Sequence, residues 1–372
     1  MTQLRVAVVG AGLAGLACAE VCGAHAALVT LFDKGRSPGG RLATRRMPSH
    51  AFDLGAQYFT ARGPGFAERV RSWVSAGVCG LWRARIVALS DATTAFRPVD
   101  GTLERFVGQP GMSALARQLA APLDVRSSHR VERIVQDGPR LRLFGSIGAA
   151  GETLRPASDG ASGERDLGAF DRVAVCLPSR QAAALVTLAS PALAARAASV
   201  EMEPCIAVGW VASAADTPAL RALPFDGAFI GRDGAKVRAP STFSALTWVA
   251  RDSSKPGRLP GERWVLHASP AWSRQHASLA DGELVRALVS EFASLFGLRP
   301  LTPTVSVVQR WALARAPEPL GGDVLYDAAS GIGLGGDWVC GGRVEGAFAS
   351  GQALAAHLLE LDTASQSESG SV

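Results

Sequence analysis

The first apolar stretches of the chain predict a strand, a turn, a helix and a second strand. Residues 6–9 are apolar and mostly β-branched, which is typical of a strand buried in a parallel sheet. Apolar residues then recur at helical spacing over residues 13–21, and a second apolar run over residues 28–32 ends at Asp33. A strand, a helix and a strand in this order predict a βαβ unit with parallel strands.

The turn inside this unit holds three glycines in the order G-x-G-x-x-G. Gly10 permits a tight turn, Gly12 lets a pyrophosphate approach the backbone, and Gly15 lets the helix lie close to the sheet. The start of the helix offers N–H groups and a positive dipole end to phosphates. Asp33 lies about 20 residues further on, where a carboxylate accepts hydrogen bonds from a ribose. These features predict a dinucleotide site without deciding between NAD and FAD.

The loop after Asp33 is rich in glycine and arginine over residues 35–47. Gly39 and Gly40 allow a close approach to the backbone, and Arg41 offers a guanidinium to a phosphate or another anionic group. Because the loop directly follows Asp33, we favour contact with the cofactor over the alternative of a solvated basic loop.

Residues 53–59 combine small, amide and aromatic side chains. Gly55 and Ala56 stand beside Gln57 and Tyr58. A stretch of this kind can pass under a flat ring, with Gln57 offering its amide. The same composition is typical of a plain strand end, and both interpretations stay open.

The apolar pattern in the rest of the first half predicts two helices, the second a short one over residues 112–119, and several strands. Apolar spacing predicts a helix over residues 66–74 that ends at Gly77. A strand over residues 125–135 turns into a hairpin with residues 140–144, and a buried strand follows over residues 172–177.

The middle of the chain has a different pattern. Short aromatic or β-branched runs over residues 205–211, 243–249 and 264–268 are separated by turn-rich pieces, which predicts an antiparallel sheet. Residues 284–295 follow with the spacing of a helix face.

A second strand-to-helix junction is predicted within residues 331–351. A short apolar run over residues 332–334 leads to Asp337, and a helix begins after Arg343. A simple NAD site has no need of this junction, whereas the longer FAD must also be held at its ribityl chain and ring. Asp337 can accept from ribityl hydroxyls, and N–H groups near Arg343 and Val344 can face the ring edge that becomes anionic on reduction. Two junctions therefore favour FAD, and an unrelated strand–turn–helix is the alternative.

The combined pattern predicts an α/β fold, with a Rossmann-type FAD-binding domain and an inserted, mostly antiparallel α+β substrate domain. The FAD-binding domain is expected over residues 1–76, 109–180 and 320–362, the substrate domain over residues 77–108 and 181–319, and a disordered tail over residues 363–372. The residues predicted to bind the cofactor are Gly10, Ala11, Gly12, Leu13, Ala14, Gly15, Asp33, Lys34, Gly40, Arg41, Ala56, Gln57, Tyr58, Val131, Gly336, Asp337, Arg343, Val344 and Ala347.

Composition limits the partners and the compartment. The chain has 372 residues, 48% of them hydrophobic, which is enough for the cores of two domains. The net charge of +5 is spread along the chain without a basic run, so we expect no nucleic-acid partner and rather an anionic small molecule. The six cysteines show no metal-binding spacing, which predicts no metal and a reduced, cytoplasmic compartment. No apolar stretch is long enough to span a bilayer, so no membrane is expected.

Four stretches carry a resemblance to a known family. GAGLAGL at 10–16, GGR at 39–41, DLGAQYFTAR at 53–62 and GDWVCGGRVEGAFASG at 336–351 resemble the flavin amine-oxidase superfamily. Within it, DLGAQYFTAR and the segment WVARDSSKPGR at 248–258 are similar to the bacterial renalase-like branch. The resemblance implies noncovalent FAD and oxidation of the 2- and 6-dihydro isomers of NAD(P)H, with O₂ as electron acceptor and hydrogen peroxide as product.

Other functions stay open at this point. Cys340 stands where amine oxidases place an aromatic ring that faces the flavin, and we interpret it as a pocket or packing residue. A flavin amine oxidase acting on a small amine is one alternative, and a non-catalytic or sensing flavoprotein is another. A dehydrogenase that uses NAD alone is a third alternative.

The residues predicted to act on the substrate are Tyr58, His267, Arg310 and Trp311. Hydride transfer from a dihydropyridine needs no side-chain base, because the ring nitrogen expels the hydride, so these residues would orient the substrate. Arg310 would pair with a phosphate or carboxamide oxygen, and His267 either faces the ring or is a core residue. We interpret the segment that holds Lys255 and Arg258 as a solvated loop; the alternative is that these two side chains hold a dinucleotide pyrophosphate.

Overall fold

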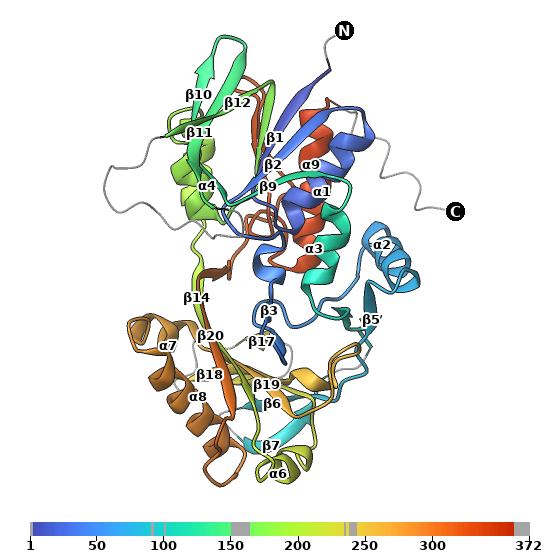
Figure 1. Ribbon diagram of the computed structural model, residues 1–372, viewed down its shortest axis with the longest axis vertical. Coiled ribbons are helices and arrows are strands. Elements are labelled where there is room, and N and C mark those ends of the chain that lie inside the picture. Colours follow the sequence, from blue (N-terminus) through green and yellow to red (C-terminus); the bar gives the residue numbers. More distant parts are fainter. Residues whose placement is uncertain are drawn as a thin grey trace. The chain divides into compact units, whose positions relative to one another are not determined.

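The computed structural model describes residues 3–90, 93–99, 102–149, 164–233, 236–237 and 244–360. The chain divides into two compact units, each with its own large sheet (Figure 1). The first unit comprises Met1–Leu42, Leu115–Met202 and Arg315–Val372, and the second unit comprises Ala43–Ala114 and Glu203–Ala314.

The first unit is built on a six-stranded sheet in the order β21-β22-β13-β1-β2-β9. Its strands are β21 (Leu325–Asp327), β22 (Ile332–Leu334), β13 (Arg172–Val175), β1 (Arg5–Val9), β2 (Leu28–Asp33) and β9 (Asp124–Ser127). The strands from β22 to β9 pair parallel, and β21 pairs antiparallel with β22. The predicted βαβ unit and parallel sheet are confirmed, because the apolar run of β1 is buried on both faces.

Two helices cover one face of this sheet, α1 (Leu13–Ala24) and α9 (Val344–Leu358), and they lie side by side in Figure 1. Their contact is close, since a Cβ added at Gly351 would lie 2.1 Å from the backbone oxygen of Ala14. A three-stranded sheet and two helices share one further apolar core of this unit. They are β10 (His129–Asp137), β11 (Arg140–Ile147), β12 (Arg165–Phe170), α4 (Ser179–Val186) and α5 (Pro191–Ala198). The remaining short elements here are η1 (Gly40–Leu42) and α3 (Ser113–Ala120), which crosses the boundary at Leu115.

The second unit is built on a seven-stranded sheet in the order β20-β14-β19-β18-β15-β6-β7. Its strands are β20 (Val305–Arg315), β14 (Glu203–Val211), β19 (Arg263–Ala268), β18 (Leu246–Arg251), β15 (Gly227–Ile230), β6 (Ile86–Ser90) and β7 (Thr93–Pro98). The strands from β14 to β15 pair antiparallel, as do β6 and β7, and β15 pairs parallel with β6. The predicted antiparallel sheet is therefore present.

Apolar side chains cover both faces of this sheet. Phe292 of α8 (Asp281–Leu295) packs against Trp210 and Trp264. On a separate patch, Phe52 packs with Ala207 and Val265. The other elements of the unit are β3 (Thr44–Arg46), β4 (Ala51–Asp53), α2 (Pro64–Ser75), β5 (Cys79–Leu81), β8 (Phe106–Gly108), α6 (Thr217–Arg221), β16 (Arg232–Asp233), β17 (Lys236–Val237), η2 (Asp252–Ser254) and α7 (Pro270–Gln275).

The units do not follow the boundaries expected from the sequence. Residues 43–76 and 109–114 belong to the second unit, and residues 181–202 and 315–319 belong to the first. The reason is packing: Phe52 of β4 lies on the sheet of the second unit, whereas α4 and α5 share the core of the first. The tail predicted to be disordered, residues 363–372, lies outside the described residues.

None of the helices in the described part of the chain combines the length and apolar character needed to cross a bilayer.

Candidate functional site

The glycine turn of the first unit has two packed positions and one open position. Gly10 has a φ of +103°, and a Cβ there would lie 2.6 Å from the backbone oxygen of Cys176. A Cβ at Gly15 would lie 2.0 Å from the oxygen of Gly10, whereas a Cβ at Gly12 meets no atom within 4 Å. Gly12 is also the N-cap of α1 and has no side chain to accept its first N–H groups. Open space therefore lies beside a helix N-terminus.

Asp33 braces this turn from the end of β2. Its Oδ2 accepts a hydrogen bond from the Ala11 N–H at 2.7 Å, and its Oδ1 accepts one from the Gly35 N–H at 2.6 Å. Burial raises the pKa of this carboxyl, although these two hydrogen bonds oppose the shift. Each carboxylate oxygen has a further lone pair, so Asp33 can still accept from a ribose hydroxyl.

Arg41 connects the loop after β2 to the end of β22. Its guanidinium forms a paired contact with Asp337, with Nη1 2.9 Å from Oδ2 and Nη2 2.5 Å from Oδ1. The Gly39 N–H donates to the Ala11 oxygen at 2.8 Å, which fixes the loop against the glycine turn. Arg41 was expected to meet a phosphate or another anionic group, and its guanidinium binds a carboxylate, the one expected to accept from the ribityl chain.

The second junction has a glycine requirement like that of the first. A Cβ at Gly346 would lie 1.6 Å from the Cys340 oxygen, and Gly336 has a φ of +153°. The N-cap of α9, Arg343, makes no capping hydrogen bond with its side chain. Because Gly351 meets Ala14, the start of α9 at Val344 lies about 10 Å along the helix axis from the contact with α1.

These features of the first unit fit FAD. Open space at Gly12, two helix N-termini and the carboxylates of Asp33 and Asp337 match two phosphates, a ribose and a ribityl chain in chemical type. The predicted cofactor residues that belong to this unit are Gly10, Ala11, Gly12, Leu13, Ala14, Gly15, Asp33, Lys34, Gly40, Arg41, Val131, Gly336, Asp337, Arg343, Val344 and Ala347. The other predicted site residues, which belong to the second unit, are Ala56, Gln57, Tyr58, His267, Arg310 and Trp311.

The second unit holds four charged side chains that water does not reach. We call Asp53, Asp252, Lys255 and Arg258 the buried charge cluster; at most 3% of each side chain is exposed. Lys255 Nζ lies 2.7 Å from Asp252 Oδ1 and 3.6 Å from Asp53 Oδ2, and Arg258 Nη2 binds the same Asp53 oxygen. The two cations balance the two carboxylates, as expected where charges are buried. The expectation of a solvated loop at Lys255 is therefore wrong.

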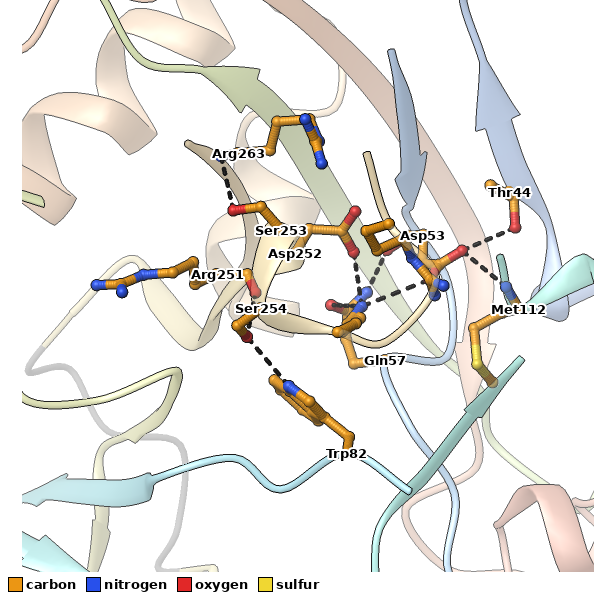
Figure 2. Close-up of polar contacts among 12 residues, drawn as sticks. Thr44, Asp53, Gln57, Trp82, Met112, Arg251, Asp252, Ser253, Ser254 and Arg263 are labelled. Carbon is orange, nitrogen blue, oxygen red and sulfur yellow. Dashed lines mark hydrogen bonds and ion pairs between the residues drawn. The ribbon is translucent and has the colours of Figure 1, made fainter. Parts of the chain in front are cut away.

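Asp53 and Asp252 differ in how fully they are bound. Figure 2 shows Asp53 receiving hydrogen bonds from the Thr44 hydroxyl and the Met112 N–H, at 2.7 and 2.9 Å. Lys255, Arg258 and these hydrogen bonds hold the pKa of Asp53 below its usual value, although burial opposes them. Asp252 binds Lys255 through Oδ1, while its Oδ2 is buried without a hydrogen-bond partner in the described structure. Burial raises the pKa of this carboxyl.

Gln57 connects the cluster to His267. Its Oε1 accepts from Lys255 Nζ at 3.2 Å, and its Nε2 donates to the carbonyls of Asp53 and Gly55. His267 Nε2 lies 3.4 Å from the same Gln57 nitrogen. The Gln57 amide, predicted to face a flat ring, is thus engaged by its own unit.

His267 and Trp311 meet at one backbone group. The Trp311 Nε1–H donates to the Leu54 oxygen at 2.9 Å, and the His267 ring is hydrogen-bonded to the Leu54 backbone as well. Burial, with the charge of Lys255, lowers the pKa of His267 to about 4, so the ring is neutral at neutral pH.

Tyr58 and Arg310 lie in different surroundings. The Tyr58 ring lies 6.1 Å from Trp82 and 5.8 Å from Trp248, centroid to centroid. Arg310 is on β20, where its guanidinium binds Asp281 at 2.5 Å and two backbone carbonyls. Arg310 is therefore held by the first residue of α8 and by the segment before it, and the described structure shows no contact between Arg310 and His267.

Sequence reasoning missed Asp53 and Asp252 as members of a site. Asp53 is the last residue of β4, after Ala51 and Phe52, and Asp252 directly follows Arg251 at the end of β18; a buried acid at either place would need a cation. That signal was present, but the cation for Asp53 comes from Arg258, which is 205 residues away.

Comparison with known families covers nearly the whole chain. Residues 8–75 match the family described as NAD(P)-binding Rossmann-like domain. Residues 71–359, more than half of the chain, match the family described as flavin containing amine oxidoreductase. The chain belongs to this family. It is therefore a flavin-dependent enzyme of an oxidase family, and membership implies FAD, a small-molecule substrate and O₂.

Solved structures of the same fold include amine oxidases. A protein assigned as protoporphyrinogen oxidase from Exiguobacterium sp. 255-15 is 13% identical with a TM-score of 0.72, covering 97% of this chain and 100% of that one. Cyclohexylamine oxidase from Brevibacterium oxydans IH-35A is 13% identical with a TM-score of 0.69, covering 96% and 99%. Putrescine oxidase bound to putrescine is 13% identical with a TM-score of 0.66, also covering 96% and 99%. At this identity the likeness shows the fold alone.

Proposed function

We propose that this protein is an FAD-dependent oxidase that removes a hydride from a carbon bonded to nitrogen, and that a small amine is its first candidate substrate. The observation that carries the proposal is the match of residues 71–359 to the flavin-containing amine oxidoreductases. The fold shared with cyclohexylamine oxidase and putrescine oxidase supports an amine as the substrate class. The particular amines named for those two proteins are not carried over to this chain.

A 2- or 6-dihydro isomer of NAD(P)H is the second candidate. Its reacting carbon also adjoins a nitrogen whose lone pair expels the hydride, so the chemistry is of the same type. One observation favours it: residues 53–62 and 248–258, which resemble the renalase-like branch, are joined through the buried charge cluster. The renalase-like assignment depends on these two segments.

When bound, FAD supplies the acceptor for two electrons, which O₂ then takes. Residues of the first unit would hold it. The space beside Gly12 and the N-terminus of α1 would receive the pyrophosphate, and Asp33 would receive the ribose. Asp337 would accept from the ribityl hydroxyls with the lone pairs that Arg41 leaves, and the first N–H groups of α9 would face the ring.

We propose that the cofactor is noncovalent. Cys340 is a free thiol, and burial together with Asp323 raises its pKa, which keeps the sulfur protonated and weakly nucleophilic. All six cysteines of the chain are free thiols, which supports a reduced, cytoplasmic compartment. In this proposal the first unit binds FAD and the second unit supplies residues that recognise the substrate.

The test is anaerobic mixing of the FAD-loaded enzyme with each substrate class, followed by the flavin absorbance. We expect rapid bleaching by one or more primary or secondary amines, and formation of hydrogen peroxide once O₂ is admitted. Bleaching by isomeric dihydronicotinamides, with no response to amines, would replace the first candidate with the second. Bound FAD that no donor of either class reduces would indicate a sensing flavoprotein and contradict both.

A further inference from the structure

Lys255 has a role in the buried charge cluster that charge balance at Asp53 does not explain. Asp53 already forms an ion pair with Arg258 and accepts hydrogen bonds from the Thr44 hydroxyl and the Met112 N–H. Lys255 Nζ lies 3.6 Å from the Asp53 carboxylate, which is a longer contact. The shorter contacts of the ammonium are with Asp252 Oδ1 at 2.7 Å and Gln57 Oε1 at 3.2 Å. Lys255 and Asp252 thus form an ion pair whose other contact is the Gln57 amide.

This pair is costly to bury. Both side chains are 0% exposed, and Asp252 Oδ2 has no hydrogen-bond partner in the described structure. An ion pair in such surroundings recovers only part of the desolvation of its two charges, so an apolar pair of similar volume would serve stability as well. A reason beyond stability is needed for keeping it, and the contact with Gln57 supplies one.

The Gln57 amide is fixed in one orientation from both sides. Two carbonyls, of Asp53 and Gly55, require the NH₂ group on one side, and the Lys255 ammonium requires the oxygen on the other. An amide flip would set oxygen against two oxygens and NH₂ against NH₃⁺. Lys255 therefore stabilises the orientation in which an N–H donor, and not an acceptor, faces His267.

That orientation also decides the state of His267. Because Gln57 Nε2 is only a donor, His267 Nε2 at 3.4 Å must carry a lone pair, and the ring proton is on Nδ1. The two amide hydrogens of Gln57 face three acceptors, namely the carbonyls of Asp53 and Gly55 and the Nε2 of His267. The hydrogen bond to the lone pair of His267 is therefore weak. His267 is of intermediate exposure, so the residue is not closed off from solvent on every side.

We propose that Lys255 is a positioning residue: anchored by Asp252, it fixes the Gln57 amide so that His267 keeps an unprotonated Nε2 that accepts an N–H of the substrate. The part about the substrate rests on the function proposed above; the part about Gln57 and His267 does not. The charge of Lys255 acts in the same direction, because it lowers the pKa of His267. The other charges of the cluster, on Asp53, Asp252 and Arg258, belong to the same buried group.

The first experiment follows the ring signals of the six histidines by NMR during a pH titration, with His267 assigned by loss of its signal in His267→Asn. In the wild type we expect His267 to stay neutral down to about pH 4 with the proton on Nδ1. In Lys255→Met we expect the His267 titration to move up by about one unit or more. The double variant Asp252→Asn/Lys255→Met removes both charges with little change of shape, and should show the same direction of shift if the single variant fails to fold.

The matched control is Arg85→Met, which removes one cation from the same unit. Arg85 pairs with Asp226 and its side chain is 58% exposed, so we expect no change in the titration of His267. An unchanged His267 titration in both Lys255 variants, or an equal shift in Arg85→Met, would overturn the positioning role.

The second experiment measures KM and kcat against pH with the substrate found above. In Lys255→Met, KM should rise as the pH falls through the new pKa of His267, while kcat stays nearly constant, because a protonated ring cannot accept an N–H. A KM that does not follow the His267 titration would refute the contact with the substrate. Should no substrate be found, the NMR result still stands, so the two failures are distinguishable.

Discussion

Gly12 separates cofactor binding from stability more cleanly than any other position of the glycine turn. An added Cβ meets no atom within 4 Å there, and the φ of −76° is one that alanine adopts without strain. We therefore expect Gly12→Ala to fold as the wild type does, with a loss of stability below about 1 kcal/mol from the poorer N-cap. The same methyl group projects into the space expected to receive the pyrophosphate.

The magnitude follows from the hydrogen bonds that the methyl group would displace. A hydrogen bond from an N–H of the first turn of α1 to a charged phosphate is worth about 1.5–3 kcal/mol. Loss of one such bond raises the Kd for FAD about 10- to 150-fold. Loss of two such bonds would weaken FAD binding so far that ordinary FAD concentrations would not saturate Gly12→Ala.

The assay is titration of the apoprotein with FAD, followed by quenching of flavin fluorescence, beside denaturant unfolding of each apoprotein. Gly15→Ala is the matched control, because its Cβ would lie 2.0 Å from the Gly10 oxygen. We expect this control to lose about 1–3 kcal/mol of stability through overpacking. Unchanged FAD affinity in Gly12→Ala, or a stability loss equal to that of Gly15→Ala, would refute the reasoning.

Three further predictions concern buried groups. Asp337→Asn leaves Arg41 without its paired carboxylate and should raise the Kd for FAD about tenfold, in the same titration; an unchanged Kd would contradict this role. Asp53→Asn should lower the free energy of unfolding by about 3–5 kcal/mol, because buried cations lose their partner, whereas the exposed ion pair lost in Arg310→Gln should cost less than about 1 kcal/mol. Equal losses in a denaturant titration would contradict the high cost of leaving a buried cation without its carboxylate. The pKa of His267 is about 4, below its value of about 6.5 in an unfolded chain, so the unfolded state binds an extra proton as the pH falls between these values. Stability should then fall by about 3 kcal/mol over that range, and His267→Asn should remove this part of the slope in unfolding measured at several pH values; identical slopes would contradict the shift.

The parts of the fold predicted from the sequence are those written in local patterns. The strand, glycine turn and helix of residues 6–21 follow from apolar spacing and from three glycines within six residues. Each glycine proved to have its own physical reason, with Gly10 and Gly15 limited by backbone contacts and Gly12 left open. The second junction, at Asp337 and α9, was found in the same way.

The parts not predicted depend on residues far apart in the chain. Arg41 has the local character of a phosphate-binding arginine, yet its partner Asp337 is 296 residues away. Lys255 lies in a polar, turn-rich segment typical of a solvated loop, and it is buried because Asp53 and Gln57 come from a distant strand end. Likewise, Phe52 belongs to the second unit only because it packs on Ala207 and Val265. Local periodicity carries no information on such partners.

The central claim is that two distant strand-to-helix junctions of one unit bind a single FAD. The most direct measurement is the visible spectrum of the purified protein, with the amount of FAD released per chain on denaturation. The account predicts a yellow protein that releases one intact FAD per chain into solution. A colourless protein that takes up no FAD when the cofactor is added would contradict it.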